Sequence, residues 1–348
     1  MKEPEVFPGK RLDEFFDLAG EAVRTHPHLV LQCFYDLSMT VRPNYPRPKT
    51  CPEVAADLAA KVEHYMALLE NGRELFPTEE ADLTRFEHDE REVKEETGEM
   101  YGRQWEKFDL EKQIEFSRRA IEHRVGRNGF DLGWLEGRRV LDMGCGSGRY
   151  ACALATWGPA EVVAVDWGEP GLHVGRAMAE AMGLRNITFQ KASIIDLPFE
   201  DESFDYCYAN GTFHHTEDMW RGLEEQYRVM KPGGAGWLYL YGTGGFFWGS
   251  RLRMREILQG VPELYAEHFL RLLSHDRNWF VPMDVWYVPI EQHTSAKDLE
   301  PFLAKLGYAG YERTRYGLPG DRTLEFLESD PLAPVIYGEG DLRYILRK

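Results

Sequence analysis

A glycine-rich turn follows a short apolar run near the middle of the chain. The run Val140–Met143 contains Asp142, and the turn "GCGSG" then places Gly144, Gly146 and Gly148 at alternate positions. Glycines allow positive φ and let a ligand approach backbone N–H groups, so such a turn can hold a phosphate, a dinucleotide or another adenosine-bearing ligand. No GxxxxGK[ST] pattern is present, which excludes a phosphate-binding P-loop, and the GxGxG spacing departs from the dinucleotide fingerprint GxGxxG.

A second acid occurs at the end of the next expected strand, where it could bind an adenosine-bearing ligand. Asp166 ends the next apolar run, "EVVAVD", ~20 residues after the glycines. A carboxylate at the end of a second strand can accept hydrogen bonds from both hydroxyls of a ribose. We therefore assign Asp166, with Trp167 beside it, to the site of the same ligand.

The surrounding elements predict an α/β fold. From Arg138 onward, short β-rich runs alternate with helical segments, as in "RRVLDMG", "YACALATWG" and "EVVAVDWG". This alternation favours a doubly wound, mostly parallel sheet with helices on both faces. Ligands bind beyond the carboxyl ends of parallel strands, so the glycine turn and Asp166 are expected at one edge. Ser295 and Gly307 are expected to begin and end a late helix.

The remaining sequence predicts two additions to this sheet. Residues 1–125 contain amphipathic helical stretches, and we expect an N-terminal helical region there, followed by a ligand-binding domain over 126–348. The segment 244–292 interrupts the strand–helix alternation, is too long for a connecting loop and is rich in aromatic residues. We expect this segment to form a cap insert.

Four segments together carry a resemblance to a known family. "VLDMGCGSG", "VVAVD", "ASIIDLPFEDESFDYCYANGTFHH" and "RVMKPGG", in this order and spacing, resemble the class I S-adenosylmethionine-dependent methyltransferases. The likeness covers about residues 136–243 and extends more loosely over 293–348. It implies a seven-stranded, Rossmann-like sheet whose last strand is antiparallel, and S-adenosyl-L-methionine as the cofactor.

The resemblance also implies roles for individual residues. The glycine loop with Asp142 would surround the methionine part of the cofactor, Asp166 would bind the ribose, and the backbone of Asn210 would lie beside the sulfonium. Relatives often have an acid near the adenine amine, where this sequence has Ser193 followed by Ile194. Serine can still hydrogen-bond the amine, and Ile194 can pack on the ring.

Two further residues are assigned to the cofactor site. Cys145 lies within the glycine loop, where it is either a passive small residue or a reactive thiol, and burial of most free cysteines favours the passive role. Tyr101, in "YGRQW", could fold over the cofactor's carboxylate, as N-terminal aromatic residues do in some relatives.

The histidines in "FHHTED" are the catalytic candidates. His214 and His215 follow the fourth expected strand, near the place where the methyl group should point. A histidine there can take a proton from a hydroxyl or amine, or it can serve a structural or cofactor-covering role. Methyl transfer from a sulfonium is a direct displacement, so proximity and desolvation can supply much of the catalysis.

Aromatic residues and histidines around the insert are candidates for binding the methyl acceptor. Aromatic faces attract a sulfonium through cation–π interactions, although ordinary core packing is the favoured explanation for any single one of them. The acceptor-binding candidates are Tyr241, Trp248, Trp286 and His293.

Composition limits the partners. The formal charge of −17 disfavours nucleic acid, because nucleic-acid binders usually carry a basic footprint. The five scattered cysteines contain no CxxC pair, and Asp196, Asp201 and Glu202 form no convincing metal-ligand set, so no metal is expected. No apolar run is long enough to span a bilayer and no secretory signal is apparent, which favours a cytoplasmic protein away from membranes.

These features predict a methyltransferase that acts on a small metabolite, with oxygen as the favoured acceptor atom and nitrogen or sulfur as alternatives. A homo-oligomer is compatible with the sequence. Two other functions remain open: methylation of a macromolecule such as tRNA or a protein, and a non-catalytic assembly protein that binds S-adenosylmethionine.

Overall fold

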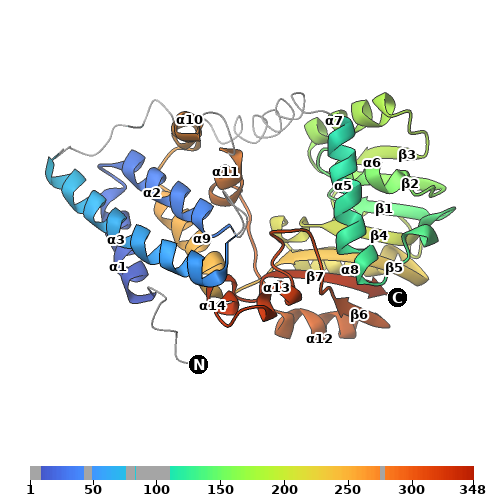
Figure 1. Cartoon of the computed structure of the whole chain (residues 1–348). Coiled ribbons are helices and arrows are strands. Elements are labelled where there is room, and N and C mark those ends of the chain that lie inside the picture. The colour runs from blue at the N-terminus through green and yellow to red at the C-terminus, as the bar shows by residue number, and fades with distance from the viewer. Residues whose placement is uncertain (1–8, 43–48, 76–82, 84–109, 275–278) are drawn as a thin grey trace. The chain divides into compact units, whose positions relative to one another are not determined.

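The chain folds into two compact units whose segments interleave along the sequence. The computed structural model describes residues 9–42, 49–75, 83, 110–274 and 279–348, and Tyr101 lies outside this part of the chain (Figure 1). Unit 1 comprises residues 1–88, 243–289 and 326–339, and unit 2 comprises 89–242, 290–325 and 340–348. The insert thus groups with N-terminal helices, whereas the sequence divided the chain at residue 125, and a capping role for 244–292 stays a prediction.

Unit 1 is helical in the part that the structure describes. Its core contains Phe15 and Phe34, and the ring of Phe34 meets Trp286 edge-on at 6.3 Å. None of the described helices in the chain is long and apolar enough to cross a bilayer. The helices of unit 1 are α1 (Gly9–Ala22), α2 (Pro27–Thr40), α3 (Cys51–Leu75), α9 (Gly245–Leu258), α10 (Glu263–Ser274), α11 (Phe280–Trp286) and α14 (Ala333–Tyr337).

Unit 2 contains the sheet. Its strands are β1 (Arg139–Met143), β2 (Glu161–Asp166), β3 (Ile187–Lys191), β4 (Phe204–Asn210), β5 (Met230–Tyr241), β6 (Gly310–Arg313) and β7 (Asp341–Arg347). Its helices are α5 (Leu110–Arg124), α6 (Arg149–Ala155), α7 (Glu169–Ala181), α8 (Met219–Val229) and α12 (Ala296–Leu306), with short 3-10 turns η2 (Gly126–Asn128), η3 (Leu132–Leu135) and η4 (Phe213–His215). Helix α13 (Leu324–Glu328) spans the boundary between the units.

The seven strands have the order β3-β2-β1-β4-β5-β7-β6. Strands β1 to β5 pair in parallel, and β7 runs antiparallel to both β5 and β6. The predicted mostly parallel seven-stranded sheet with an antiparallel last strand is confirmed. The carboxyl ends of β1, β2, β4 and β5 consequently lie along one edge.

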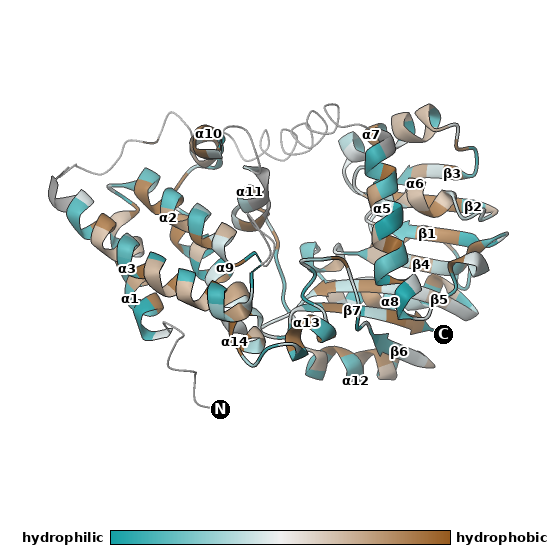
Figure 2. Ribbon diagram, in the orientation of Figure 1, coloured by the Kyte–Doolittle hydropathy of each residue, from teal (hydrophilic) through white to brown (hydrophobic). Residues whose placement is uncertain are grey.

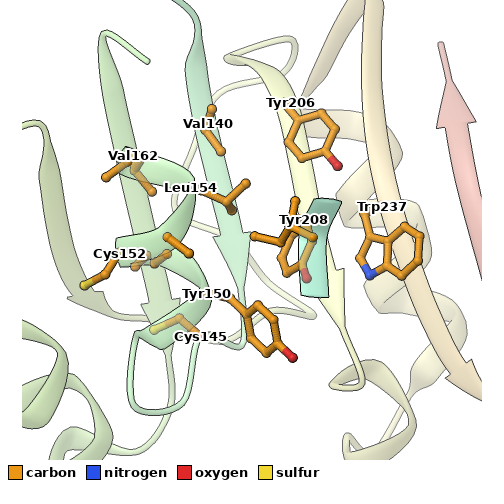
Figure 3. Close-up of a cluster of buried hydrophobic side chains, with 14 of the residues drawn as sticks. Val140, Cys145, Tyr150, Cys152, Leu154, Val162, Tyr206, Tyr208 and Trp237 are labelled. Atoms are coloured by element: carbon orange, nitrogen blue, oxygen red, sulfur yellow. The ribbon is translucent and has the colours of Figure 1, made fainter. Parts of the chain in front are cut away.

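Helices cover both faces of the sheet because successive strand residues point to opposite sides. Val140 and Tyr206 face a cluster with α5, α6 and α7, whereas Leu141 and Cys207 face a second cluster with α8 and α12. Helix α5 is largely hydrophilic with a few hydrophobic residues among them (Figure 2), and Ile114, Ala120 and Ile121 pack in the first cluster. In the first cluster, Tyr150 of α6 meets Tyr208 of β4, which stacks on Trp237 of β5 (Figure 3).

Local sequence sets the ends of the helices. In α12 the backbone N–H of Asp298 donates to the Ser295 hydroxyl at 3.1 Å, and Gly307 follows the helix at φ +102°. The predicted start and stop of this helix are therefore confirmed. In α8 the Asp218 side chain accepts from the N–H of Arg221 at 3.0 Å in the same capping role.

A buried ionic network ties α5 to the last strand. Asp321 accepts two bonds from the Arg124 guanidinium, both at 2.8 Å, and lies 2.6 Å from Nη1 of Arg343. Arg343 also pairs with Asp341, which holds Arg322 at 2.6 Å. Burial opposes ionisation of Asp321, but Arg343 and Arg124 outweigh it and hold the pKa of this carboxyl below its usual range.

Replacing Asp321 by Asn should destabilise the chain by about 3–5 kcal/mol, because two buried guanidiniums lose their shared carboxylate. Urea denaturation followed by circular dichroism measures this change. Glu169→Gln is the matched control, since the Glu169–Arg176 pair is exposed and its loss should leave the free energy of unfolding unchanged. Equal stability of the two variants would show that the network does not stabilise the fold.

Candidate active site

The glycine turn after β1 is held by its neighbours on both sides. The N–H groups of Gly144 and Cys145 donate to the Val165 carbonyl at 2.8 and 2.9 Å. Gly144 has φ +74°, and a Cβ there would lie 2.6 Å from a methyl carbon of Thr212. The Thr212 hydroxyl in turn donates to the Met143 carbonyl at 3.0 Å. The turn is therefore clamped between β2 and the segment that follows β4.

Asp166 joins this turn to the end of β2. One of its oxygens accepts from the N–H of Gly146 and the other from that of Gly168, each at 2.8 Å. Burial raises the pKa of Asp166, and the backbone donors around it oppose that rise. A carboxylate oxygen can accept more than one hydrogen bond, so each oxygen retains acceptor capacity for a ligand hydroxyl.

The space over Gly146 is open. This glycine has φ +53°, and among the residues that the structure describes, its chain neighbours apart, no atom lies within 4 Å of the Cβ that another residue would place there. The backbone of the turn can thus be approached closely by a ligand, as the sequence predicts for glycines in such a loop.

Asp142 is a buried acid in β1, just before the glycine turn. Burial, followed by the charge of Asp166, raises the pKa of Asp142 to about 8, although an N–H of Ala151 opposes the rise. Its Oδ2 atom is buried and has no hydrogen-bond partner within the described part of the chain. Because a buried carboxylate oxygen without a partner is costly, this atom is suited to bind a donor or cationic group of a ligand.

The other predicted cofactor residues occupy distinct surroundings. Cys145 belongs to the buried cluster on the α6 face, and burial raises the pKa of its thiol well above the usual value, which disfavours a reactive thiolate. The side-chain oxygen of Asn210 accepts from the indole N–H of Trp237 at 3.0 Å, which leaves the Asn210 backbone at the strand end. Trp167 is 70% exposed beside Asp166, and Lys191 lies 5.2 Å from its ring.

The turn after β3 contains the residues expected near an adenine. Ser193 forms an isolated bridge with Asp196, and its hydroxyl oxygen accepts weakly from the N–H of Ile195 at 3.4 Å. Ile194 is buried in the cluster on the α8 face. Both residues follow β3 at the same sheet edge, and their contacts with an adenine stay predictions.

Two histidines and two further predicted residues come together beyond β4 and β5. His214 is fully buried and stacks on Tyr241, with ring centroids 3.7 Å apart at 27°. His215 lies 4.3 Å from the His214 ring and meets Tyr241 edge-on at 5.5 Å. The ring of His293 lies 5.9 Å from that of Tyr241. We call His214, His215, Tyr241 and His293 the histidine–tyrosine cluster.

His215 has a defined orientation within this cluster. Its Nδ1 lies 2.8 Å from the carbonyl oxygen of Ile290. A carbonyl only accepts hydrogen bonds, so Nδ1 carries the hydrogen and the neutral ring presents its lone pair at Nε2. This arrangement suits a residue that takes up a proton.

The two predicted tryptophans, Trp248 of α9 and Trp286 of α11, belong to unit 1. Trp248 and Trp286 are buried within unit 1, where Trp248 meets Phe247 edge-on at 4.7 Å and Trp286 contacts Phe34. Core packing accounts for these contacts. Their predicted role in binding a methyl acceptor stays a prediction.

Two residues of this region were not singled out from the sequence. Thr212 clamps the glycine turn, and no spacing or residue pattern signals that role. Glu291 lies 2.9 Å from Nε2 of His293, and its side chain is fully buried. An acid two positions before a candidate histidine was the available signal for Glu291.

Comparisons with known proteins agree with this geometry. Residues 141–238 match a family model described as a methyltransferase domain. The chain is 40% identical over 101 residues to a demethylmenaquinone methyltransferase of Geobacillus kaustophilus, a match that covers 28% of this chain and 43% of that protein. It is 35% identical over 117 residues to the Staphylococcus aureus protein of the same name, covering 32% and 48%. The chain thus spans less than half the length of these relatives.

Solved structures include a similar protein described as a SAM-dependent methyltransferase from Aquifex aeolicus. The sequence identity is 18% and the TM-score is 0.41, with 69% of this chain and 99% of that chain covered.

Asp142→Asn should change how stability depends on pH. The folded-state pKa of about 8 exceeds the ordinary 3.8, so the folded chain binds this proton more tightly, and stability falls as pH rises between these values. The slope from one such group is at most about 1.4 kcal/mol per pH unit. Asparagine does not titrate and removes this slope. The free energy of unfolding of the variant, measured by urea denaturation without ligand, should therefore rise relative to that of wild type between pH 5 and pH 8. Parallel profiles for the two proteins would contradict this assignment.

Proposed function

Residues 141–238 belong to a class I S-adenosylmethionine-dependent methyltransferase domain, as the sequence predicted, and from this premise we propose that the chain methylates a small molecule at oxygen. The observation that carries the proposal is that β1, β2 and β4 are parallel, so their carboxyl ends lie at the same edge of the sheet. Asp142 and Asp166 are near the ends of β1 and β2, and His215 follows β4. Residues that could bind a methyl donor and a residue that could accept a proton therefore occur in the same unit.

The residues present fit S-adenosylmethionine. Asp166 would accept hydrogen bonds from the ribose hydroxyls with the acceptor capacity that its backbone bonds leave. The unpartnered Oδ2 of Asp142 would bind the ammonium of the methionine part, and the open space at Gly146 admits the ligand against the turn. When bound, S-adenosylmethionine supplies an electrophilic methyl group whose bonding electron pair stays with sulfur on transfer.

His215 would serve as the general base. Its Nε2 would take the proton of an acceptor hydroxyl as the oxygen attacks the methyl carbon, while Nδ1 remains bonded to Ile290. His214 is buried beneath Tyr241 and would hold that ring in place. This division of roles separates two histidines that the sequence alone treats alike.

Charge and relatives support a small-molecule acceptor. A net charge of −17 disfavours tRNA as a partner, since the phosphate backbone requires a basic surface. The relatives named demethylmenaquinone methyltransferase carry the name of a small acceptor, although their match lies in the methyltransferase domain. Methylation of a macromolecule and non-catalytic binding of S-adenosylmethionine remain the alternatives.

A labelled-methyl assay tests the proposed function. The purified chain is incubated with tritiated S-adenosylmethionine and a cell extract separated into small and large fractions. Label should appear in a product of the small fraction, and chemical stability of the bond should identify an ether or ester. Label confined to protein or RNA would favour the macromolecular alternative, and tight binding without transfer would favour the non-catalytic one.

Asp166→Ala should weaken binding of S-adenosylmethionine by about 1–3 kcal/mol, because charge-assisted hydrogen bonds to the ribose are lost. Isothermal titration calorimetry measures the affinity. Glu161→Ala, at the start of the same strand and paired with Arg139, is the control and should bind normally. An unchanged affinity in Asp166→Ala would remove this residue from the cofactor site.

His215→Gln should lower kcat by about 10²–10⁴-fold with cofactor affinity intact, because the acceptor loses its general base. The loss should shrink at high pH, where the acceptor ionises without help. His214→Phe retains a ring against Tyr241 and should lose less than tenfold. A loss in His215→Gln that stays constant across pH would contradict proton abstraction by this residue.

A further inference from the structure

The segment 290–294 is hydrogen-bonded at several points to residues 214–216 and to Tyr241. Besides the bond from His215 to Ile290, the Gln292 N–H donates to the His214 carbonyl at 2.8 Å and its side-chain amide donates to the Thr216 carbonyl. The N–H of Thr294 donates to the Tyr241 carbonyl at 3.3 Å. These residues form neither helix nor strand, so they depend on such bonds for their position.

His293 and Glu291 fasten this segment from within. Nδ1 of His293 lies 2.7 Å from the Gly242 carbonyl, which only accepts, so this nitrogen carries a hydrogen. Nε2 lies 2.9 Å from Oε1 of Glu291, and one proton must lie between these two atoms. The pair is therefore either imidazolium with carboxylate or imidazole with carboxylic acid, and it is neutral as a whole in both forms.

The pair stands one residue from the partner of His215. Ile290 immediately precedes Glu291, and its carbonyl is the acceptor that selects the hydrogen on Nδ1 of His215. Side chains of both Glu291 and His293 are nine-tenths buried or more, so the pair has little freedom to shift. A displacement of Glu291 would carry the Ile290 carbonyl with it and release the ring of His215.

We propose that Glu291 is a positioning residue, which acts through His293 and the Ile290 carbonyl to keep the lone pair of His215 at Nε2. The bond that His293 donates to the Gly242 carbonyl anchors the segment, and the bond that His215 donates to the Ile290 carbonyl transmits that anchor to the base. The role as a positioning residue for catalysis rests on the proposed function, whereas the control of the His215 tautomer does not.

The tautomer of His215 is the direct readout. Two-bond ¹⁵N–¹H correlation spectra of chain labelled with [¹⁵N]histidine, recorded about two units above the ordinary histidine pKa, report which nitrogen carries hydrogen. The signals missing from His215→Gln identify this residue. Wild type should show hydrogen on Nδ1 alone, and Glu291→Ala should show a mixture of both tautomers.

Two variants separate the pair's geometry from general damage. Glu291→Gln can still donate to Nε2 of His293 and should retain the wild-type tautomer. Glu300→Ala removes a glutamate that accepts a hydrogen bond from Tyr344 at 2.8 Å in the same unit, and it should leave His215 unchanged. A wild-type tautomer in Glu291→Ala, or equal changes in the alanine and glutamine variants, would overturn the proposal. If Glu291→Ala does not fold, His293→Asn removes the same bond and gives the same test.

Kinetic measurements then test whether the effect of Glu291→Ala acts through His215. Glu291→Ala should lower kcat about 10- to 100-fold with the KM for S-adenosylmethionine unchanged, as expected when a reacting group is misplaced. In a His215→Gln background the same substitution should cause no further loss. A full additional loss there would show that Glu291 acts independently of His215 and would overturn the proposal. Absence of any methyl transfer by wild type would refute the proposed function while leaving the tautomer result to decide the role of Glu291.

Discussion

One carboxylate joins the turns that follow two adjacent strands. Asp166 accepts from the N–H of Gly146 in the turn after β1 and from that of Gly168 in the turn after β2. These bonds favour the ionised carboxylate in a region where burial favours the neutral acid. The same charge adds to the effect of burial in raising the pKa of Asp142.

The glycine turn and the strand ends of the proposed cofactor site could be predicted from the sequence because their signals are local. The spacing of Gly144, Gly146 and Gly148 predicts a turn, and Asp166 at the end of an apolar run indicates the end of a strand. Parallel pairing then brings these ends to one edge without any knowledge of side-chain packing. The number of strands and the antiparallel last strand followed from family resemblance, whereas the place of β7 between β5 and β6 became known only from the structure.

The acceptor side depends on contacts between distant segments, which no short pattern encodes. His215 and Ile290 are 75 positions apart, and the orientation of the His215 ring, our proposed base, depends on that pairing. Glu291 belongs to no recognisable motif. Its partner His293 is hydrogen-bonded to Gly242, which precedes the insert in the sequence, and no local pattern predicts that contact. Aromatic content similarly could not distinguish Trp248, which packs in the core of unit 1, from Tyr241, which stacks on a histidine.

The position of β7 has a consequence for how the chain is made. This strand is synthesised after every other strand, yet it lies between β5 and β6 in the finished sheet. Until it emerges from the ribosome, β5 presents a long edge of unpaired N–H and carbonyl groups, a feature that promotes association between chains. Premature termination before Asp341 would therefore leave the nascent chain with an exposed template for aggregation.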